Sequence, residues 1–192
     1  MSAVARVGER ALRIAIPPGT PRAALLAWLL ERPAVVDASL AAEHALVVFD
    51  GPPHSIEIPP LDATHVECVE YVIEVVYDGE DLEEVAALSH LAPDEVARRH
   101  ASSTLEVAFS GFCPGFAYLT GLDPSLASIA RRGSPRPRVP ENAVAIAGGY
   151  TAIYPAPMPG GWRLIGRAIA PRLLDGDAPR LGVGDRVRFV AR

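Results

Sequence analysis

Hydrophobic and polar residues alternate along residues 11–16, ALRIAI, so that every second side chain faces the same way. This period of two predicts a β-strand with one buried face. Thr20 and Pro21 then provide an N-cap and a proline at the first helical position, which predicts a helix over residues 21–32. Together with two further hydrophobic runs, the pattern predicts a β-α-β-β unit of α+β class, with its last two strands at residues 34–40 and 45–50.

A second block of elements follows a proline-rich stretch. Residues 71–79, YVIEVVYDG, are β-branched and end in a turn signal, which predicts another strand. Asp81, with Glu84 three positions later, predicts a capped helix, and Pro93 opens another helix. We place the domain boundary after residue 76, which gives a small α+β domain over 1–76 and a second domain, the barrel, over 77–192.

From Leu105 onward no stretch keeps a helical period. Short hydrophobic runs are separated by glycine and proline, which predicts a mainly-β, closed or nearly closed barrel. In the last run Val187 and Phe189 should point inward, so that this strand closes the barrel. The predicted strands lie at residues 105–109, 143–147, 150–154, 162–166 and 185–190.

Composition excludes several classes of protein. The 192 residues are 49% hydrophobic and 21% charged, which is typical of a chain with a packed core. The net charge of −5 argues against a nucleic-acid partner. No apolar run reaches the roughly 18 residues of a membrane helix, and residues 1–10 lack a secretory signal, so we expect a cytoplasmic protein with no membrane contact. Cys68 and Cys113 do not have metal-ligand spacing, so no metal site is predicted.

The chain contains no lysine, because all 18 basic residues are arginine. A Walker A phosphate loop and a pyridoxal Schiff base both require lysine, so both are excluded. Any phosphate bound by this chain must therefore meet arginine, backbone N–H groups or a metal ion.

Residues 109–122, FSGFCPGFAYLTGL, combine glycine with many rings. Gly115 and its neighbouring glycines permit positive φ or close backbone approach, and Pro114 stiffens the turn. The aromatic residues line a pocket in one interpretation and simply pack into the end of the barrel in the other. They are Phe112, Phe116 and Tyr118.

Four arginines follow within eight residues, and no acidic residue lies between Asp123 and Glu141. Guanidinium groups bind carboxylate or phosphate with two parallel hydrogen bonds, so this segment predicts an anion site. A solvated basic loop is the alternative. The arginines are Arg131, Arg132, Arg136 and Arg138.

Two glycine pairs, at 148–149 and 160–161, flank further candidate residues for the same pocket. Rings beside glycine pairs can form a surface for a flat ligand, although a β-hairpin with a core tryptophan would give the same pattern. His100, at the end of a predicted helix, would be favoured in its protonated form there and suits an acid/base role. The other candidates are Tyr150, Thr151, Tyr154 and Trp162.

Several of these segments occur in the same order in a known family. GFCPGFAYLTGLDPSL, PRPRVP, AIAGGYTAIYP, PGGWRLIGR and GDRVRF resemble the family of KipI and the B-type subunits of 5-oxoprolinase, also called allophanate hydrolase subunit 1 or carboxyltransferase subdomain C and D. The resemblance covers about residues 75–190. It implies a ferredoxin-like N-terminal domain followed by a cyclophilin-like β-barrel.

The resemblance also implies a function. Members act with a homologous larger, C-type subunit, together with an A-type subunit, to hydrolyse 5-oxoproline to glutamate. ATP with Mg²⁺ is a substrate of the complex, and no tightly bound cofactor is expected. One member instead inhibits a histidine kinase, so a non-catalytic binding module is the alternative.

We assign provisional roles on the chemistry of the side chains. His100 is the expected acid/base, and Arg136, with Arg131 and Arg138, is expected to hold phosphate or carboxylate. The remaining members of the expected cleft are Gly115, Phe116, Tyr118, Tyr150, Thr151, Tyr154 and Trp162.

Overall fold

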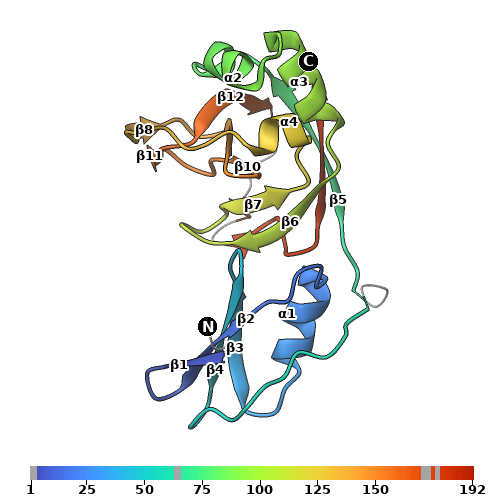
Figure 1. Ribbon diagram of the computed structural model, residues 1–192, viewed down its shortest axis with the longest axis vertical. Coiled ribbons are helices and arrows are strands. Elements are labelled where there is room, and N and C mark those ends of the chain that lie inside the picture. Colours follow the sequence, from blue (N-terminus) through green and yellow to red (C-terminus); the bar gives the residue numbers. More distant parts are fainter. Residues whose placement is uncertain (1–3, 63–65, 170–173, 176–177) are drawn as a thin grey trace.

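The N-terminal part of the chain forms a four-stranded antiparallel sheet with one helix on one face, and the rest forms a closed barrel (Figure 1). The computed structural model describes residues 4–62, 66–169, 174–175 and 178–192. None of the helices in these residues is long and apolar enough to cross a membrane.

The N-terminal sheet has the strand order β1-β2-β4-β3. The predicted β-α-β-β unit is confirmed as β2, α1, β3 and β4, and a further strand, β1, forms a hairpin with β2. The alternation seen in the sequence places Leu12 and Ile14 on the buried face, where they pack with Leu25 and Leu29 of the helix. The elements are β1 (Val4–Val7), β2 (Ala11–Ala15), α1 (Arg22–Leu30), β3 (Val35–Leu40) and β4 (His44–Phe49).

The ferredoxin-like form of this domain is not confirmed. A ferredoxin-like domain has two helices on its sheet, but α1 is the one helix between residues 4 and 62. The segment after β4 instead adds Ile56, with Ile58 and Leu61, to the same hydrophobic core. The predicted cap is also wrong: the Thr20 hydroxyl donates to the Pro17 carbonyl at 2.7 Å and leaves the first turn of α1 uncapped.

The barrel is closed by seven strands in the order β10-β7-β6-β15-β5-β12-β9. The closing role predicted for the last strand is confirmed, because β15 runs parallel to β5 and antiparallel to β6. Its Val187 and Phe189 are both 2% exposed and face the core. The strands are β5 (Glu70–Val76), β6 (Leu105–Ser110), β7 (Ala117–Thr120), β9 (Ala143–Ala147), β10 (Tyr150–Ile153), β12 (Arg163–Ile169) and β15 (Arg186–Ala191).

The predicted domain boundary after residue 76 is wrong by one strand. β5 is one of the barrel strands, between β15 and β12, so the barrel begins at Glu70. The local sequence correctly indicated a strand. Its hydrogen-bonding partners lie about 100 residues further along the chain, where local patterning gives no information on them.

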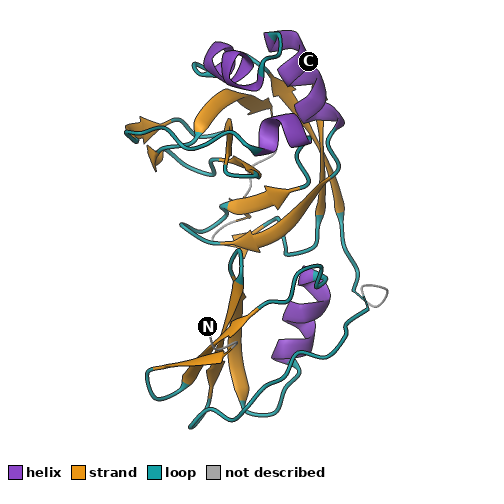
Figure 2. Ribbon diagram, viewed as in Figure 1, coloured by secondary structure: helices purple, strands orange, loops and turns teal. Residues whose placement is uncertain are grey.

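Short elements complete the barrel domain. Helices α2 (Leu82–Ser89), α3 (Pro93–Ser102) and α4 (Pro124–Ala127) gather at the end remote from the N-terminal domain (Figure 2). Two strand pairs lie outside the barrel: β8 (Arg136–Val139) with β11 (Met158–Gly160), and β13 (Leu174–Asp175) with β14 (Ala178–Pro179).

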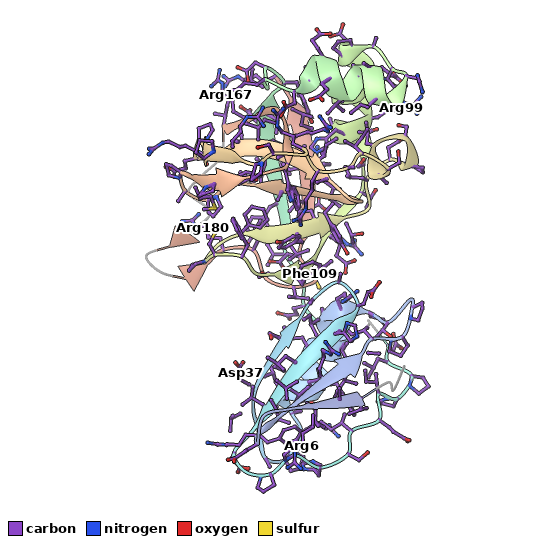
Figure 3. All side chains as sticks on the ribbon, turned by 60° about the vertical axis from the view of Figure 1, so that its left-hand side comes forward. Arg6, Asp37, Arg99, Phe109, Arg167 and Arg180 are labelled. Carbon is purple, nitrogen blue, oxygen red and sulfur yellow. The ribbon has the colours of Figure 1, made fainter. Side chains whose placement is uncertain are left out.

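The two parts of the molecule share a hydrophobic contact. Ala108 and Phe109 of β6 belong to the same core cluster as Leu12 and Phe49 of the N-terminal sheet. Phe109 accordingly lies where the two parts meet (Figure 3). The outer side of β6 therefore joins the domains.

Candidate functional site

A cleft of about 340 Å³ opens beside the β8–β11 pair and is lined mainly by aromatic residues. The residues that line it come from the loop before β7, β7 itself, the arginine-rich segment, the end of β10, and β11 with the two residues before β12. Three of the segments singled out in the sequence therefore meet here. The lining residues are Phe112, Phe116, Tyr118, Arg131, Pro135, Tyr154, Pro159, Gly160, Gly161 and Trp162.

Phe116 is the centre of the aromatic group. Its ring meets Tyr118, Tyr154 and Trp162 edge-to-face, with centroid distances of 5.1, 5.3 and 5.6 Å. Edge-to-face contacts of this kind add to the stability gained by burial. Phe116 and Tyr154 are almost fully buried, so the floor of the cleft is fixed by packing.

A tight loop between β6 and β7 forms one rim. The N–H of Gly111 donates to the Phe116 carbonyl at 3.1 Å, and that of Phe116 donates to the Cys113 carbonyl at 3.1 Å. Gly115 adopts a φ of 79° there, which explains the glycine, but it does not line the cleft. Phe112 has a φ of 72° and is 65% exposed. A positive φ is strained for such a residue, and strain of this kind is concentrated at functional sites.

Arg131 provides the charge of the cleft. Its guanidinium carbon lies 5.9 Å from the centre of the Trp162 ring. Burial raises the pKa of the Tyr118 and Tyr154 hydroxyls, and the nearby charge of Arg131 offsets part of that rise. No ion pair of Arg131 is found within the described residues. Its guanidinium is therefore available to an anion.

Arg136 does not line the cleft. Its Nη2 donates to Asp81 Oδ1 at 2.7 Å, and its Nε donates to Glu80 at 3.2 Å. Arg132 donates to the same Asp81 oxygen at 2.8 Å. The catalytic role expected for Arg136 does not fit this geometry, because its guanidinium is committed to carboxylates that precede it by about 55 residues.

The acidic group around Asp81 neutralises two of the four clustered arginines, Arg132 and Arg136. Glu84 pairs with Arg132 at 3.6 Å and also with Arg163. Asp81 itself is 3% exposed, and its other oxygen accepts the backbone N–H of Leu164 at 2.7 Å. Arg138 is exposed on β8 and lies outside the lining of the cleft.

His100 lies inside the barrel and not in the cleft. It is fully buried, and its ring stacks on Phe189 at a centroid distance of 4.8 Å. Burial lowers the pKa of the imidazole to about 3. The expectation that His100 is protonated at the helix end is therefore wrong, because the cost of burying a charge exceeds the favourable effect of the helix end.

A hydrogen-bonded chain explains why a histidine occupies the core. The Thr151 hydroxyl donates to the Ala145 carbonyl at 3.0 Å, so its oxygen accepts from His100 Nε2 at 2.8 Å. His100 Nδ1 then accepts from the Tyr77 hydroxyl at 2.8 Å. Thr151 is thus part of the barrel interior. Tyr150 lies towards the domain junction, 5.5 Å from the Phe109 ring, and does not line the cleft either.

Comparison with known proteins assigns the chain to a family. Residues 4–175 match the family described as carboxyltransferase domain, subdomain C and D. The chain belongs to the carboxyltransferase C and D family. This confirms the resemblance found in the sequence.

Two proteins similar to this chain are each named as the B subunit of 5-oxoprolinase. That of Bacillus subtilis (strain 168) is 42% identical over 123 residues, which cover 62% of this chain and 51% of that protein. That of Escherichia coli O157:H7 is 35% identical over 206 residues, covering 96% of this chain and 93% of that protein. The alignment thus spans about half the length of one relative and nearly all of the other.

A solved structure gives the same fold. The crystal structure of TTHA0988 superimposes with a TM-score of 0.77 at 34% identity, covering 95% of this chain and 40% of that one. This chain therefore corresponds to one part of TTHA0988, which is the longer protein.

The polar side chains that line the cleft are few: the guanidinium of Arg131, the phenol hydroxyls of Tyr118 and Tyr154, and the indole N–H of Trp162. None of the lining residues carries a carboxylate, an imidazole or a thiol. The thiol of Cys113, in the loop between β6 and β7, lies 3.6 Å from the sulfur of Met158, and burial raises its pKa and so keeps it a poor nucleophile. Within the described ranges, no three His, Cys, Asp or Glu residues gather as metal ligands.

Sequence reasoning missed some members of the site. Pro135, Pro159 and the Gly160–Gly161 pair line the cleft, although the sequence pattern drew attention only to the glycine pair, as a flank of the rings. A Cβ on Gly160 would lie 2.2 Å from the Tyr154 hydroxyl oxygen, so glycine is required for that packing. The sequence pattern also indicated that the Asp81 side chain caps a helix, but it forms no cap hydrogen bond. Nothing in the local sequence shows that this carboxylate accepts hydrogen bonds from two arginines.

Proposed function

We propose that this chain is one subunit of an ATP-dependent amide hydrolase of the 5-oxoprolinase type. The proposed reaction converts 5-oxoproline, ATP and water to glutamate, ADP and phosphate. The relatives named as the B subunit of 5-oxoprolinase support the assignment. Because that name describes one part of a larger assembly, it also supports the proposal that the chain acts with a homologous larger, C-type subunit, together with an A-type one.

The observation that carries the proposal is a cleft large enough for a small molecule that has no carboxylate, imidazole or thiol in its lining. Ring opening of a lactam needs an activated carbonyl, because an unstrained amide is a poor electrophile. Phosphorylation of the carbonyl oxygen by MgATP, with release of ADP, would supply that activation. Water would then add to the carbonyl carbon, the ring C–N bond would break to free the amine, and a second water would hydrolyse the resulting acyl phosphate to glutamate and phosphate. Because its lining has no carboxylate, imidazole or thiol, the cleft suits binding and orientation, and the partner subunits would supply the catalytic groups.

The assay is ADP release that depends on 5-oxoproline, measured with the three subunits co-expressed from one genome. We expect release from the complex and none from this chain alone. A complex that assembles but releases no ADP would remove the hydrolase proposal and favour the alternative, a non-catalytic binding module.

A variant of the cleft ties this activity to the chain. Gly161→Val should raise the KM for 5-oxoproline at least tenfold, because the added side chain enters the cleft beside Pro135, whose Cβ lies 3.6 Å from where a Cβ on residue 161 would be. Gly133→Val is the matched control, since a Cβ there meets nothing within 4 Å and the residue lies outside the lining. An equal KM in both variants would place the substrate elsewhere.

A further inference from the structure

The distribution of charge around the cleft restricts the ligands that it accepts. Arg131 is the one charged residue among those lining it. The neighbouring arginines are held by ion pairs with carboxylates of the segment that begins α2. They are Arg132, Arg136 and Arg163.

The single available guanidinium, that of Arg131, suits a ligand with a single carboxylate. Arg131 can form two parallel, charge-assisted hydrogen bonds to a carboxylate group. A nucleotide triphosphate carries several negative charges, and a largely apolar cleft with a single cation would leave most of them desolvated and unpaired. The charge therefore favours a monoanion over ATP.

The ring geometry favours a compact ring over a nucleobase. The rings that line the cleft cross at steep angles, 61° to 88° around Phe116 and 70° between Tyr118 and Trp162. In none of these five contacts are the two rings parallel, so the contacting rings present crossed faces and edges and no stacked pair. They form an apolar surface that a small, largely saturated ring can contact.

A polar group is present beside this surface. Among the described residues, no hydrogen bond of the Tyr118 hydroxyl is found, and Arg131 is near enough for its charge to act on that hydroxyl. Burial raises the pKa of Tyr118, so the hydroxyl remains protonated and can donate a hydrogen bond. A lactam carbonyl is a suitable acceptor.

We propose that the cleft binds the lactam substrate itself, with the ring on the aromatic residues and the carboxylate on Arg131, and that the phosphates of ATP bind elsewhere in the complex. This inference rests on the proposed function for the choice of lactam. It assigns this chain the amide subsite. It also narrows the expectation that Arg131, Arg136 and Arg138 hold phosphate or carboxylate to Arg131 and a carboxylate.

The test uses the fluorescence of Trp162 in the full-length chain. Trp28→Phe removes the other tryptophan, which lies in the N-terminal domain, so that the signal reports on the cleft alone. The ligands are 5-oxoproline, 2-pyrrolidinone, which is the same ring without the carboxylate, and MgATP. We expect 5-oxoproline to change the fluorescence with a Kd at least tenfold lower than that of 2-pyrrolidinone, and MgATP to cause no change.

Variants assign the carboxylate to one residue. Loss of a charge-assisted hydrogen bond typically weakens binding by about tenfold or more. Arg131→Gln should therefore raise the Kd of 5-oxoproline at least tenfold and leave that of 2-pyrrolidinone unchanged. Arg13→Gln is the charge-matched control, because Arg13 is exposed on β2 in the N-terminal sheet.

The outcomes separate this inference from the proposed function. The inference is overturned if 5-oxoproline causes no change at millimolar concentrations, if Arg131→Gln affects both lactams equally, or if MgATP occupies the cleft. Ring binding that depends on Arg131 supports it even if the assembled complex releases no ADP, in which case the hydrolase function alone is lost. ADP release whose KM is unaffected by Arg131→Gln leaves the hydrolase and removes the lactam subsite.

Discussion

Asp81 is the residue whose replacement should most clearly separate structural arginines from binding ones. Its Oδ1 accepts from Arg132 and Arg136, and its Oδ2 accepts from the backbone of Leu164, in a site where the carboxylate is 3% exposed. Asparagine has the same shape but only one acceptor oxygen. In Asp81→Asn the amide NH₂ must therefore face either the Leu164 N–H or the two guanidinium groups.

The magnitude follows from this geometry. Breaking a buried charge pair by removing one partner costs about 3–5 kcal/mol, because the other charge stays buried. The side chain of Arg136 is 16% exposed and keeps its contact with exposed Glu80, so we take the lower end, about 3 kcal/mol. For a chain of this size that loss lowers the thermal midpoint by about 6–12 °C.

The assay is thermal unfolding followed by circular dichroism, with a double-mutant cycle against Arg136→Met. Since Arg136→Met leaves no unpaired guanidinium at that position, Asp81→Asn should cost less in its background than in the wild type. A fall of less than about 2 °C for Asp81→Asn, or strict additivity in the cycle, would refute the reasoning. Arg136 would then be free for a ligand, as the sequence suggested.

Acid should act through the same residue. Burial raises the pKa of Asp81, but hydrogen bonds from Arg136 and Leu164 and the two arginine charges outweigh it, so the pKa is lowered overall. The stability that the ionised carboxylate contributes is therefore complete above the unfolded value of about 4 and is lost as the pH falls through the folded pKa. Asp81→Asn should show a shallower loss of stability below pH of about 4.

Three further predictions concern the barrel. Thr151→Val keeps the shape of the side chain but leaves His100 Nε2 without its acceptor, so urea unfolding should show a loss of about 1–3 kcal/mol. Because the folded pKa of His100 is about 3, the unfolded state binds more protons below pH of about 6.5, and stability should fall by about 1.4 kcal/mol per pH unit between about pH 6 and 4. Gly121→Ala should destabilise the barrel strongly, since φ is 100° and the Cβ would lie 2.1 Å from a backbone oxygen.

Each of these has a control. Ser102→Ala removes an exposed hydroxyl from α3 and should cost much less than Thr151→Val. His100→Gln should flatten the pH dependence, whereas His54→Gln, at an exposed position, should not; a slope that survives in His100→Gln contradicts the assignment. Gly133→Ala should be nearly neutral, because a Cβ there meets nothing within 4 Å, and equal losses at both glycines would contradict the steric argument.

The local patterns of the sequence determined much of the secondary structure. The alternation in residues 11–16 became β2, and the inward Val187 and Phe189 became part of the closing strand β15. These predictions hold because the period of a strand is set by neighbours in the sequence, and because a hydrophobic face must be buried wherever it packs. The ring-rich loop at 109–122 was likewise recognisable, and its rings do line a cleft.

The partners of charged and polar groups were decided only by the tertiary structure. In the sequence, four arginines without a nearby acid looked equally available to a ligand. The acid that neutralises Arg132 and Arg136 lies at the start of α2, about 50 residues earlier in the chain. Arg131 is left without an ion pair among the described residues. The partners of buried His100 were likewise decided by the fold, because Tyr77, just after β5, and Thr151 of β10 are distant from it in the sequence. Hydrophobic burial is non-directional and can be read from composition and period, whereas an ion pair or a hydrogen bond requires two particular atoms within about 3 Å, which only the folded chain brings together.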